Sequence, residues 1–251
     1  MVIIDIIMST RNPLSAGWII PDTFPDITTG QLHVWKTRAG VHADDAILSA
    51  DERLRLKRFR FAEQRQSFLS SHTLLRRLIG QYLNLHPAKI EFSYTAFNKP
   101  FLSPSQNDKQ LEFNLSHSGE MILIGVTVGT AVGVDVEHTK PLPDLEQIAA
   151  LNFSSGEQQD LLSLPEPQRV EAFYKCWTRK EALIKACGDG LTMSLDSFRV
   201  SLLPGGPARL IHSMDQRTWT LIDIAMESGY AAAAALPIAN VDAQYYDAVG
   251  V

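Results

Sequence analysis

Short apolar runs, most of them alternating with polar residues, recur along the chain and predict strands. They occupy residues 32–37, 90–94, 112–116, 121–128, 132–137, 197–201, 219–226 and 230–236. Stretches with apolar residues at helical spacing lie between them. The apolar start, residues 2–8, is interrupted by Asp5 and lacks a cationic leader, so it predicts a buried strand rather than a signal peptide. Strands and helices mixed in this way are typical of an α+β fold.

Two similar signals for the start of a helix indicate an internal repeat. The pattern Ser-x-x-Glu at residues 49–52 and again at 154–157 has the spacing of a helix capping box. The same offset of 105 positions matches further apolar residues, Phe68 with Phe173 and Leu78 with Leu183. We therefore expect two pseudo-symmetric lobes of similar fold, an N-terminal lobe of residues 1–130 and a C-terminal lobe of residues 131–251.

The composition is that of a chain with a sizeable core. It has 251 residues, of which 45% are hydrophobic and 20% charged, which excludes a disordered protein. No run of about 18 apolar residues is present, so we expect no membrane span. The net charge of −5 argues against a nucleic-acid partner. The only two cysteines, Cys176 and Cys187, form neither a disulfide framework nor a metal-binding pair, so we expect a protein of the reducing cytoplasm.

Two carboxylates share one face of a predicted strand. Alternation in residues 133–137 places Asp135 and Glu137 on one side of the strand, and valines on the other. Carboxylates this close repel each other unless a cation lies between them, and such hard oxygen ligands suit Mg²⁺ or Mn²⁺. A solvated outer face of an amphipathic strand has the same pattern, so spacing alone leaves both interpretations open.

The helix predicted for residues 173–187 carries charged residues within and beside its apolar stripe. Lys180 projects from the middle of the stripe, and Glu181 and Lys185 lie one turn apart along its edge. A buried lysine needs an anionic partner or a ligand, whereas a lysine at the rim of a lobe extends its ammonium group into water. The pattern does not decide between these roles.

Two turns and a basic stretch offer contacts to an anion. Ser116 and His117 end a strand where lobes commonly bind ligands, and without an acidic orienter they favour oxyanion binding over hydrolysis. Lys99 and Pro100 mark another turn, which is either a surface turn or an anion contact. Residues 53–60 hold five cations, which suit a phosphate, an acidic partner or simply a solvated helix face.

The order and spacing of these motifs resemble the 4'-phosphopantetheinyl transferase superfamily, and most closely its surfactin-synthetase-activating branch. The motifs are Asn98-Lys99-Pro100, Phe113-Asn114-Leu115-Ser116-His117-Ser118, Gly133-Val134-Asp135-Val136-Glu137, Trp177-Thr178-Arg179-Lys180-Glu181-Ala182-Leu183-Ile184-Lys185 and Gly188-Asp189-Gly190-Leu191. The resemblance runs from residue 49 to residue 200 and implies a monomer of two fused α+β lobes with the active site in the cleft between them.

This resemblance implies a Mg²⁺-dependent reaction, with Mn²⁺ as a substitute metal. Phosphopantetheine passes from coenzyme A to a serine of an apo acyl, peptidyl or aryl carrier protein, and adenosine 3',5'-bisphosphate is left. The implied metal ligands are Asp135, Glu137 and Glu181, and Glu181 is also the implied base. Lys180 and Lys185 would neutralise the diphosphate. The other implied coenzyme A contacts are Ser116, His117 near the 3'-phosphate, Lys99 and Pro100 at the adenine, Arg55 and Arg76.

Three positions depart from the family pattern. Asn98 replaces a glycine, Asp189 replaces a frequent lysine, and Ser67 stands where an arginine is often found. The last difference leaves open which residues clamp the 3'-phosphate.

Two other functions agree with the same residues. One is a coenzyme A or carrier-protein binding module without transfer activity, and the other is a metal-dependent phosphohydrolase that uses water as acceptor. The sequence also leaves open which carrier protein is modified and whether acylated coenzyme A is accepted.

Overall fold

The computed structural model describes residues 17–96, 99–188, 193–212 and 216–251, and the strand expected for residues 2–8 lies outside them. The strands are β1 (Gln31–Arg38), β2 (Phe92–Tyr94), β3 (Pro100–Leu102), β4 (Leu111–Ser118), β5 (Met121–Val128), β6 (Gly133–His138), β7 (Arg199–Val200), β8 (Leu210–His212), β9 (Thr220–Asp223), β10 (Tyr230–Leu236) and β11 (Asp242–Asp247). The α-helices are α1 (Ala50–Arg58), α2 (Ala62–Leu83), α3 (Leu145–Asn152), α4 (Ser155–Ser163) and α5 (Glu166–Cys187). Short 3₁₀ helices are η2 (Asp45–Ile47), η3 (Pro87–Lys89), η4 (Pro104–Gln106) and η6 (Leu195–Ser197). Within the described ranges, every helix is too short or too polar to cross a membrane.

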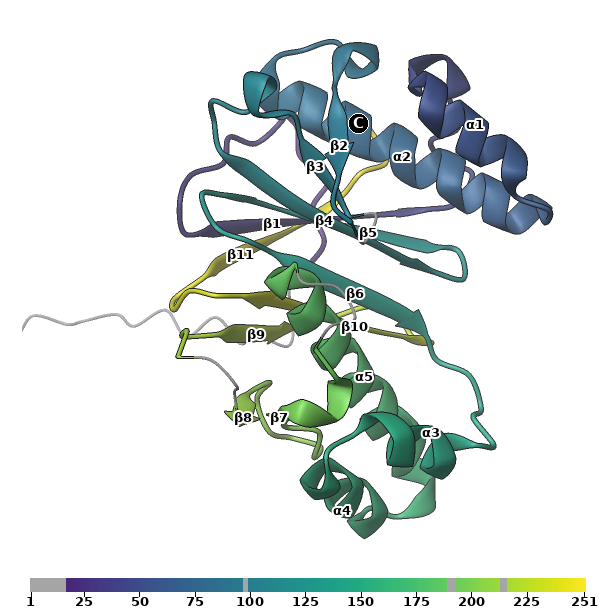
Figure 1. Ribbon diagram of the computed structural model, residues 1–251, viewed down its shortest axis with the longest axis vertical. Helices are drawn as coiled ribbons and strands as arrows, with labels where there is room; N and C mark the ends of the chain where they lie inside the picture. The colour runs from purple at the N-terminus through teal and green to yellow at the C-terminus, as the bar shows by residue number, and fades with distance from the viewer. Residues whose placement is uncertain (1–16, 97–98, 189–192, 213–215) are drawn as a thin grey trace, which may run out of the picture.

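Both halves of the chain repeat one topology. In the N-terminal half, β1 is followed by α1, α2, the hairpin β2–β3 and the strands β4 and β5, and the sheet order is β1-β5-β4. In the C-terminal half, β6 is followed by helices, the hairpin β7–β8 and the strands β9 and β10, and the order is β6-β10-β9. Both predicted capping boxes are present, at Ser49 and Ser154. These findings confirm the predicted repeat and the α+β arrangement, in which helices lie outermost and the sheets between them (Figure 1).

Three strands, β3, β8 and β11, were not expected from the sequence, and β11 enlarges the N-terminal sheet. β11 pairs in parallel with β1, from Gln31 opposite Asp242 to Lys36 opposite Asp247. The N-terminal sheet therefore has the order β11-β1-β5-β4, and it includes a strand from beyond the boundary expected near residue 130. This strand covers an edge of β1 that would otherwise present unpaired backbone groups.

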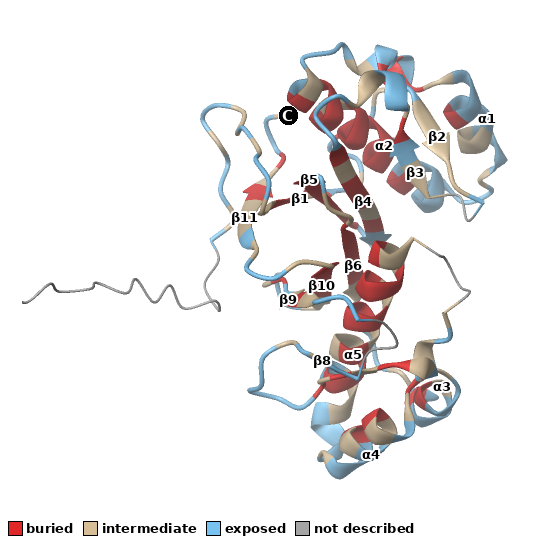
Figure 2. Cartoon of the chain, turned by 60° about the vertical axis from the view of Figure 1, so that its left-hand side comes forward, coloured by how far each residue is buried: buried red, intermediate tan, exposed pale blue. Residues whose placement is uncertain are grey.

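Polar side chains join the two sheets where β4 lies beside β6. Side-chain oxygens on β4 accept hydrogen bonds from backbone N–H groups on β6: Asn114 from Val134 at 2.9 Å, Ser116 from Val136 at 3.3 Å and Ser118 from His138 at 3.1 Å. Because side chains alternate along a strand, these three β4 residues share one face. Four of the eight residues of β4 and four of the six residues of β6 are buried (Figure 2). We call this set of hydrogen bonds the β4–β6 ladder.

Helix α5 approaches β6 closely at a glycine. A Cβ atom on Gly133 would lie 1.9 Å from the carbonyl oxygen of Ala182 and 2.5 Å from the backbone nitrogen of Ala186. Both alanines are buried, so the helix backbone itself forms the contact. This approach brings the neighbouring residues Glu181 and Lys185 to the edge of β6.

Each lobe contains a buried ion pair that begins at its capping-box glutamate. Glu52 pairs with Arg76 at 2.7 Å, and Glu157 pairs with Lys180 at 2.8 Å. All four residues are at most 1% exposed. In both lobes the pair ties the short helix that the capping box begins to the long helix that follows it.

We predict that Gly133→Ala destabilises the protein by about 3 kcal/mol or more, because the added methyl group has to displace helix backbone. Urea denaturation followed by circular dichroism measures this loss. Gly206→Ala is the control, since the nearest atom to its Cβ would be the Leu203 carbonyl oxygen at 3.8 Å. A Gly133 variant as stable as the Gly206 variant would contradict the close approach.

We predict that Lys180→Ala lowers the free energy of unfolding by about 3–5 kcal/mol, because it leaves Glu157 buried without its cation. Lys175→Ala on the same helix removes a pair with Glu171 whose side chains are 33% and 71% exposed, and should cost less than about 1 kcal/mol. The two variants are compared by the same urea titration. Similar losses in both would argue against a structural role for the buried pair.

Candidate active site

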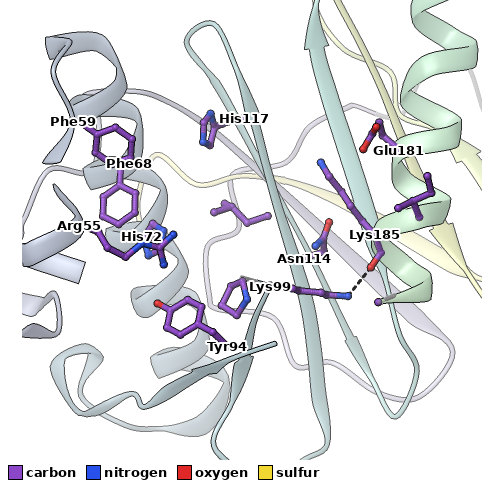
Figure 3. Close-up of a pocket in the computed structure, with 14 residues that line it drawn as sticks. Arg55, Phe59, Phe68, His72, Tyr94, Lys99, Asn114, His117, Glu181 and Lys185 are labelled. Atoms are coloured by element: carbon purple, nitrogen blue, oxygen red, sulfur yellow. Dashed lines mark hydrogen bonds between the residues drawn. The ribbon is translucent and has the colours of Figure 1, made fainter. Parts of the chain in front are cut away.

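A cavity of about 500 Å³ lies between the lobes. Its walls come from α1, α2, β2, β3 and β4 of the N-terminal half and from the C-terminal part of α5. Figure 3 shows Arg55, Phe59 and Phe68 at one end and Glu181 with Lys185 at the other. Of the site residues expected from the sequence, those that line it are Arg55, Lys99, Pro100, His117, Glu181 and Lys185.

The carboxylate end of the site is built around Asp135. Its Oδ1 accepts hydrogen bonds from Lys185 Nζ at 2.7 Å and from Ser116 Oγ at 2.9 Å. Its Oδ2 is buried and has no hydrogen-bond partner among the described residues. Glu137, two residues along β6, accepts a hydrogen bond from Ser118 Oγ at 2.7 Å. The predicted shared face of the two carboxylates thus points towards β4 and α5.

Three carboxyl groups near Lys185 have raised pKa values. Burial raises the pKa of Asp135, Glu137 and Glu181. The charge of Asp135 raises the pKa of both glutamates further, and Lys185 opposes the shift at all three. The group therefore concentrates negative charge that an additional cation would stabilise.

Asp135, Glu137 and Glu181 are ligands of the kind that a hard divalent cation prefers, but they are not arranged around an ion. Among the described residues, no three His, Cys, Asp or Glu side chains are gathered closely enough to hold an ion. The ammonium group of Lys185 lies against Asp135 instead. Asp135, Glu137 and Glu181 offer carboxylate oxygens, and Asp135 Oδ2 has no hydrogen-bond partner in the described part of the chain, so the chemistry of these ligands suits Mg²⁺ or a similar ion.

The cavity wall is cationic between its two ends. Lys99 Nζ donates to the backbone oxygen of Lys185 at 2.7 Å, and burial lowers the pKa of Lys99. Burial also lowers the pKa of His117, as do the charges of Lys185 and His72. Positive groups crowded in this way would be stabilised by an anion in the cavity.

Five of the expected site residues do not line the cavity: Asp135, Glu137, Ser116, Lys180 and Arg76. Asp135 is joined to the lining through its ion pair with Lys185, whereas Lys180 and Arg76 have other partners. Lys180 lies inside the C-terminal lobe, where its Nζ bonds Glu157 and the backbone oxygens of Leu195 and Phe198. Arg76 is equally buried beside Glu52. Both cations project from the inner face of a long helix, where a buried carboxylate neutralises them and no ligand is needed.

Ser116 also differs from its expected role. It does not line the cavity; its hydroxyl group belongs to the β4–β6 ladder and donates to Asp135. Lys185 Nζ lies 3.0 Å from the same oxygen. Ser116 therefore positions two site residues. Asn98 and Asp189 lie outside the described residues.

The basic stretch 53–60 divides between two surfaces. Arg55 turns into the cavity, where its guanidinium lies 5.2 Å from the ring centre of Tyr94. Arg53 and Lys57 border a separate depression together with Arg65. The helix α1 therefore offers only part of its charge to the cavity.

Sequence reasoning missed several residues of the site. His72, Phe68, Tyr94 and Asn114 all line the cavity. The spacing of four between Phe68 and His72 on one helix was an available signal, because residues four apart share a helix face. What they face depends on the packing of α2 against β4, which local periodicity does not encode.

Comparison with known proteins agrees with this geometry. The family model "4'-phosphopantetheinyl transferase, N-terminal" matches residues 35–128, and that of the "4'-phosphopantetheinyl transferase superfamily" matches residues 131–235. The 4'-phosphopantetheinyl transferase HetI of Nostoc sp. strain PCC 7120 is 33% identical over 219 residues, which are 84% of this chain and 91% of that protein. The transferase Sfp of Bacillus subtilis strain 168 is 35% identical over 161 residues, covering 64% of this chain and 69% of that protein.

A solved structure of the holo-[acyl-carrier-protein] synthase of Thermotoga maritima overlaps in part. Its TM-score is 0.35 at 24% identity, and it covers 42% of this chain and 61% of that chain. We draw no conclusion from so partial an overlap. The sequence relationships suffice: the chain belongs to the 4'-phosphopantetheinyl transferase superfamily, in its surfactin-synthetase-activating type, whose members transfer phosphopantetheine from coenzyme A to a carrier protein.

Proposed function

We propose that the cavity between the lobes is where this enzyme transfers phosphopantetheine from coenzyme A to a carrier serine, with Mg²⁺ held by Asp135, Glu137 and Glu181. The observation that carries the proposal is the joining of two kinds of group at one end of the cavity. Glu181 and Lys185 line that end, and Lys185 Nζ pairs with the buried Asp135, whose Oδ2 has no hydrogen-bond partner among the described residues. A diphosphate and a divalent cation together need this combination of charges.

In the proposed reaction, the serine oxygen forms a bond to the phosphorus that carries pantetheine. The bond from that phosphorus to the leaving phosphate breaks, and adenosine 3',5'-bisphosphate departs. Mg²⁺ would supply positive charge against the diphosphate. Glu181 accepts the proton of the serine hydroxyl group, a role that its raised pKa favours. No covalent enzyme intermediate is needed, since positioning and charge neutralisation suffice.

Lys185 is proposed to neutralise the diphosphate. Its side chain is 28% exposed and borders the cavity while its Nζ contacts Asp135, so the same ammonium group serves the carboxylates and an incoming phosphate. Arg55, Lys99 and His117 are proposed to bind the rest of coenzyme A, with Pro100 and Tyr94 beside the adenine. Both walls come from one chain, which supports a monomer as the active unit.

We also propose that the enzyme works in the cytoplasm and binds neither nucleic acid nor membrane. In support, Cys176 and Cys187 form no disulfide and the chain is acidic overall. A binding module that has lost transfer activity is not favoured, because the proposed base and the proposed metal ligands are all retained around the cavity.

We predict that this protein, with coenzyme A and Mg²⁺, adds about 340 Da to an apo carrier protein, the increment of a phosphopantetheine group. Intact-mass spectrometry of a panel of acyl, peptidyl and aryl carriers detects the change and shows which carriers are accepted. EDTA should abolish the shift, and added Mg²⁺ should restore it. A shift that persists in EDTA would remove the metal from the proposal.

We predict that Glu181→Gln lowers the rate of carrier modification by about 100-fold or more, because the amide accepts no proton and is a poorer metal ligand. Coenzyme A binding, measured by isothermal titration calorimetry, should stay within a few-fold of the wild-type value. Glu171→Gln is the control, since Glu171 is exposed on the same helix and pairs with Lys175. A Glu181 variant with wild-type turnover would exclude this residue as the base.

A further inference from the structure

His72 belongs to a buried ionic cluster and is the member of it that reaches the cavity. Its Nδ1 lies 2.9 Å from Oε1 of Glu52, whose Oε2 accepts a hydrogen bond from Arg76 Nε at 2.7 Å. Its ring stacks on Phe68 with centroids 4.0 Å apart. Only 6% of His72 is exposed, and it lines the cavity wall. With Nδ1 engaged by Glu52, Nε2 is the ring atom left to bind a ligand.

Glu52 fixes the orientation of the imidazole. Burial by itself raises the pKa of Glu52, but hydrogen bonds from His72 and from the Ser49 backbone, with the charge of Arg76, outweigh this and lower the pKa to about 2. The carboxylate is therefore ionised and accepts the Nδ1–H of His72. A proton on Nε2 then turns that atom into a donor, which a phosphate next to it stabilises.

In the C-terminal lobe the matching cluster is fully buried, since Glu157, Lys180 and Cys176 are each 0% exposed. Helices α2 and α5 both have 22 residues and begin at Ala62 and Glu166, so their residues correspond at an offset of 166 − 62 = 104, one less than the offset between the capping boxes. This offset matches Arg76 with Lys180 and His72 with Cys176. Cys176 is fully buried, and burial and the neighbouring Glu157 raise its pKa. A small buried thiol therefore fills this position where the cluster is closed. The histidine occurs where the position is open to the cavity.

Other cationic groups border the same part of the cavity. The guanidinium of Arg55 lies 5.6 Å from the ring centre of Phe68, on which His72 stacks. The charge of His72 contributes to lowering the pKa of His117. Glu181, the one acidic residue of the described lining, lies at the opposite end. Ser67 is buried and does not line the cavity.

We infer that His72, oriented by Glu52, binds the 3'-phosphate of coenzyme A together with Arg55 and His117, and so makes the enzyme distinguish coenzyme A from 3'-dephospho-coenzyme A. The inference rests on the proposed function, because it takes this cavity as the coenzyme A site. It adds His72 to the phosphate contacts expected from the sequence, since Ser67 does not line the cavity.

Isothermal titration calorimetry of the full chain with coenzyme A and with 3'-dephospho-coenzyme A, without carrier protein, tests this inference. The wild type should bind coenzyme A more tightly. His72→Gln, which keeps a polar group near Glu52 but has no cationic form, should weaken coenzyme A binding about 10-fold, or about 1.4 kcal/mol. Its affinity for 3'-dephospho-coenzyme A should change less than about two-fold. Cys176→Ser, at the matching position of the closed cluster, should leave the ratio of the two affinities unchanged.

Three results would overturn the inference. They are an equal loss of affinity for both ligands in His72→Gln, an unchanged affinity for coenzyme A in that variant, and a wild type that binds both ligands equally. The last result needs no variant, so a misfolded His72→Gln does not leave the question open. Carrier modification by the wild type is scored separately by mass. A protein that modifies carriers but binds both ligands equally would refute only this inference. A protein that binds coenzyme A more tightly than 3'-dephospho-coenzyme A but modifies no carrier would refute only the proposed function.

Discussion

The β4–β6 ladder is the interaction on which the site depends. Ser116 and Ser118 accept backbone N–H groups of β6 and donate their own protons to Asp135 and Glu137. Each hydroxyl group thus links the two sheets and at the same time orients a carboxylate. Separating the strands would leave buried N–H groups and carboxylates without partners, which is costly in a low-dielectric interior. The joint between the lobes and the carboxylate end of the site are therefore one structure.

Both lobes contain the same kind of buried ion pair, but its surroundings differ between them. A capping-box glutamate reaches from a short helix into a long one and pairs with a buried cation in both halves. In the C-terminal lobe the cluster is closed, and its cation, Lys180, contributes to stability. In the N-terminal lobe the cluster continues through His72 to the cavity. The same ion pair that stabilises the lobe therefore presents a histidine of fixed orientation to the ligand space.

The charges of the cavity are arranged along its length. Glu181 and Lys185 line one end, where Lys185 also pairs with the buried Asp135. Cationic and imidazole side chains lie among the aromatic and apolar residues of the remaining wall, namely Arg55, His72, Lys99 and His117. A chain of net charge −5 thus keeps a local cationic surface inside an acidic protein. This distribution suits a ligand with several phosphate groups that meets a divalent cation at one end only.

Local geometry made several features predictable from the amino-acid sequence: the described strands other than β3, β8 and β11, both capping boxes, the repeat, and the shared face of Asp135 and Glu137. Helical and strand periodicity fix these directions within a few residues. Which charged groups border the cavity depends instead on how the lobes pack. Lys180 and Lys185 are five residues apart on one helix, yet one is neutralised by Glu157 and the other borders the cavity. The partners that make this difference, like the strand that pairs with β1, come from distant parts of the chain, and their contacts arise only when the lobes pack.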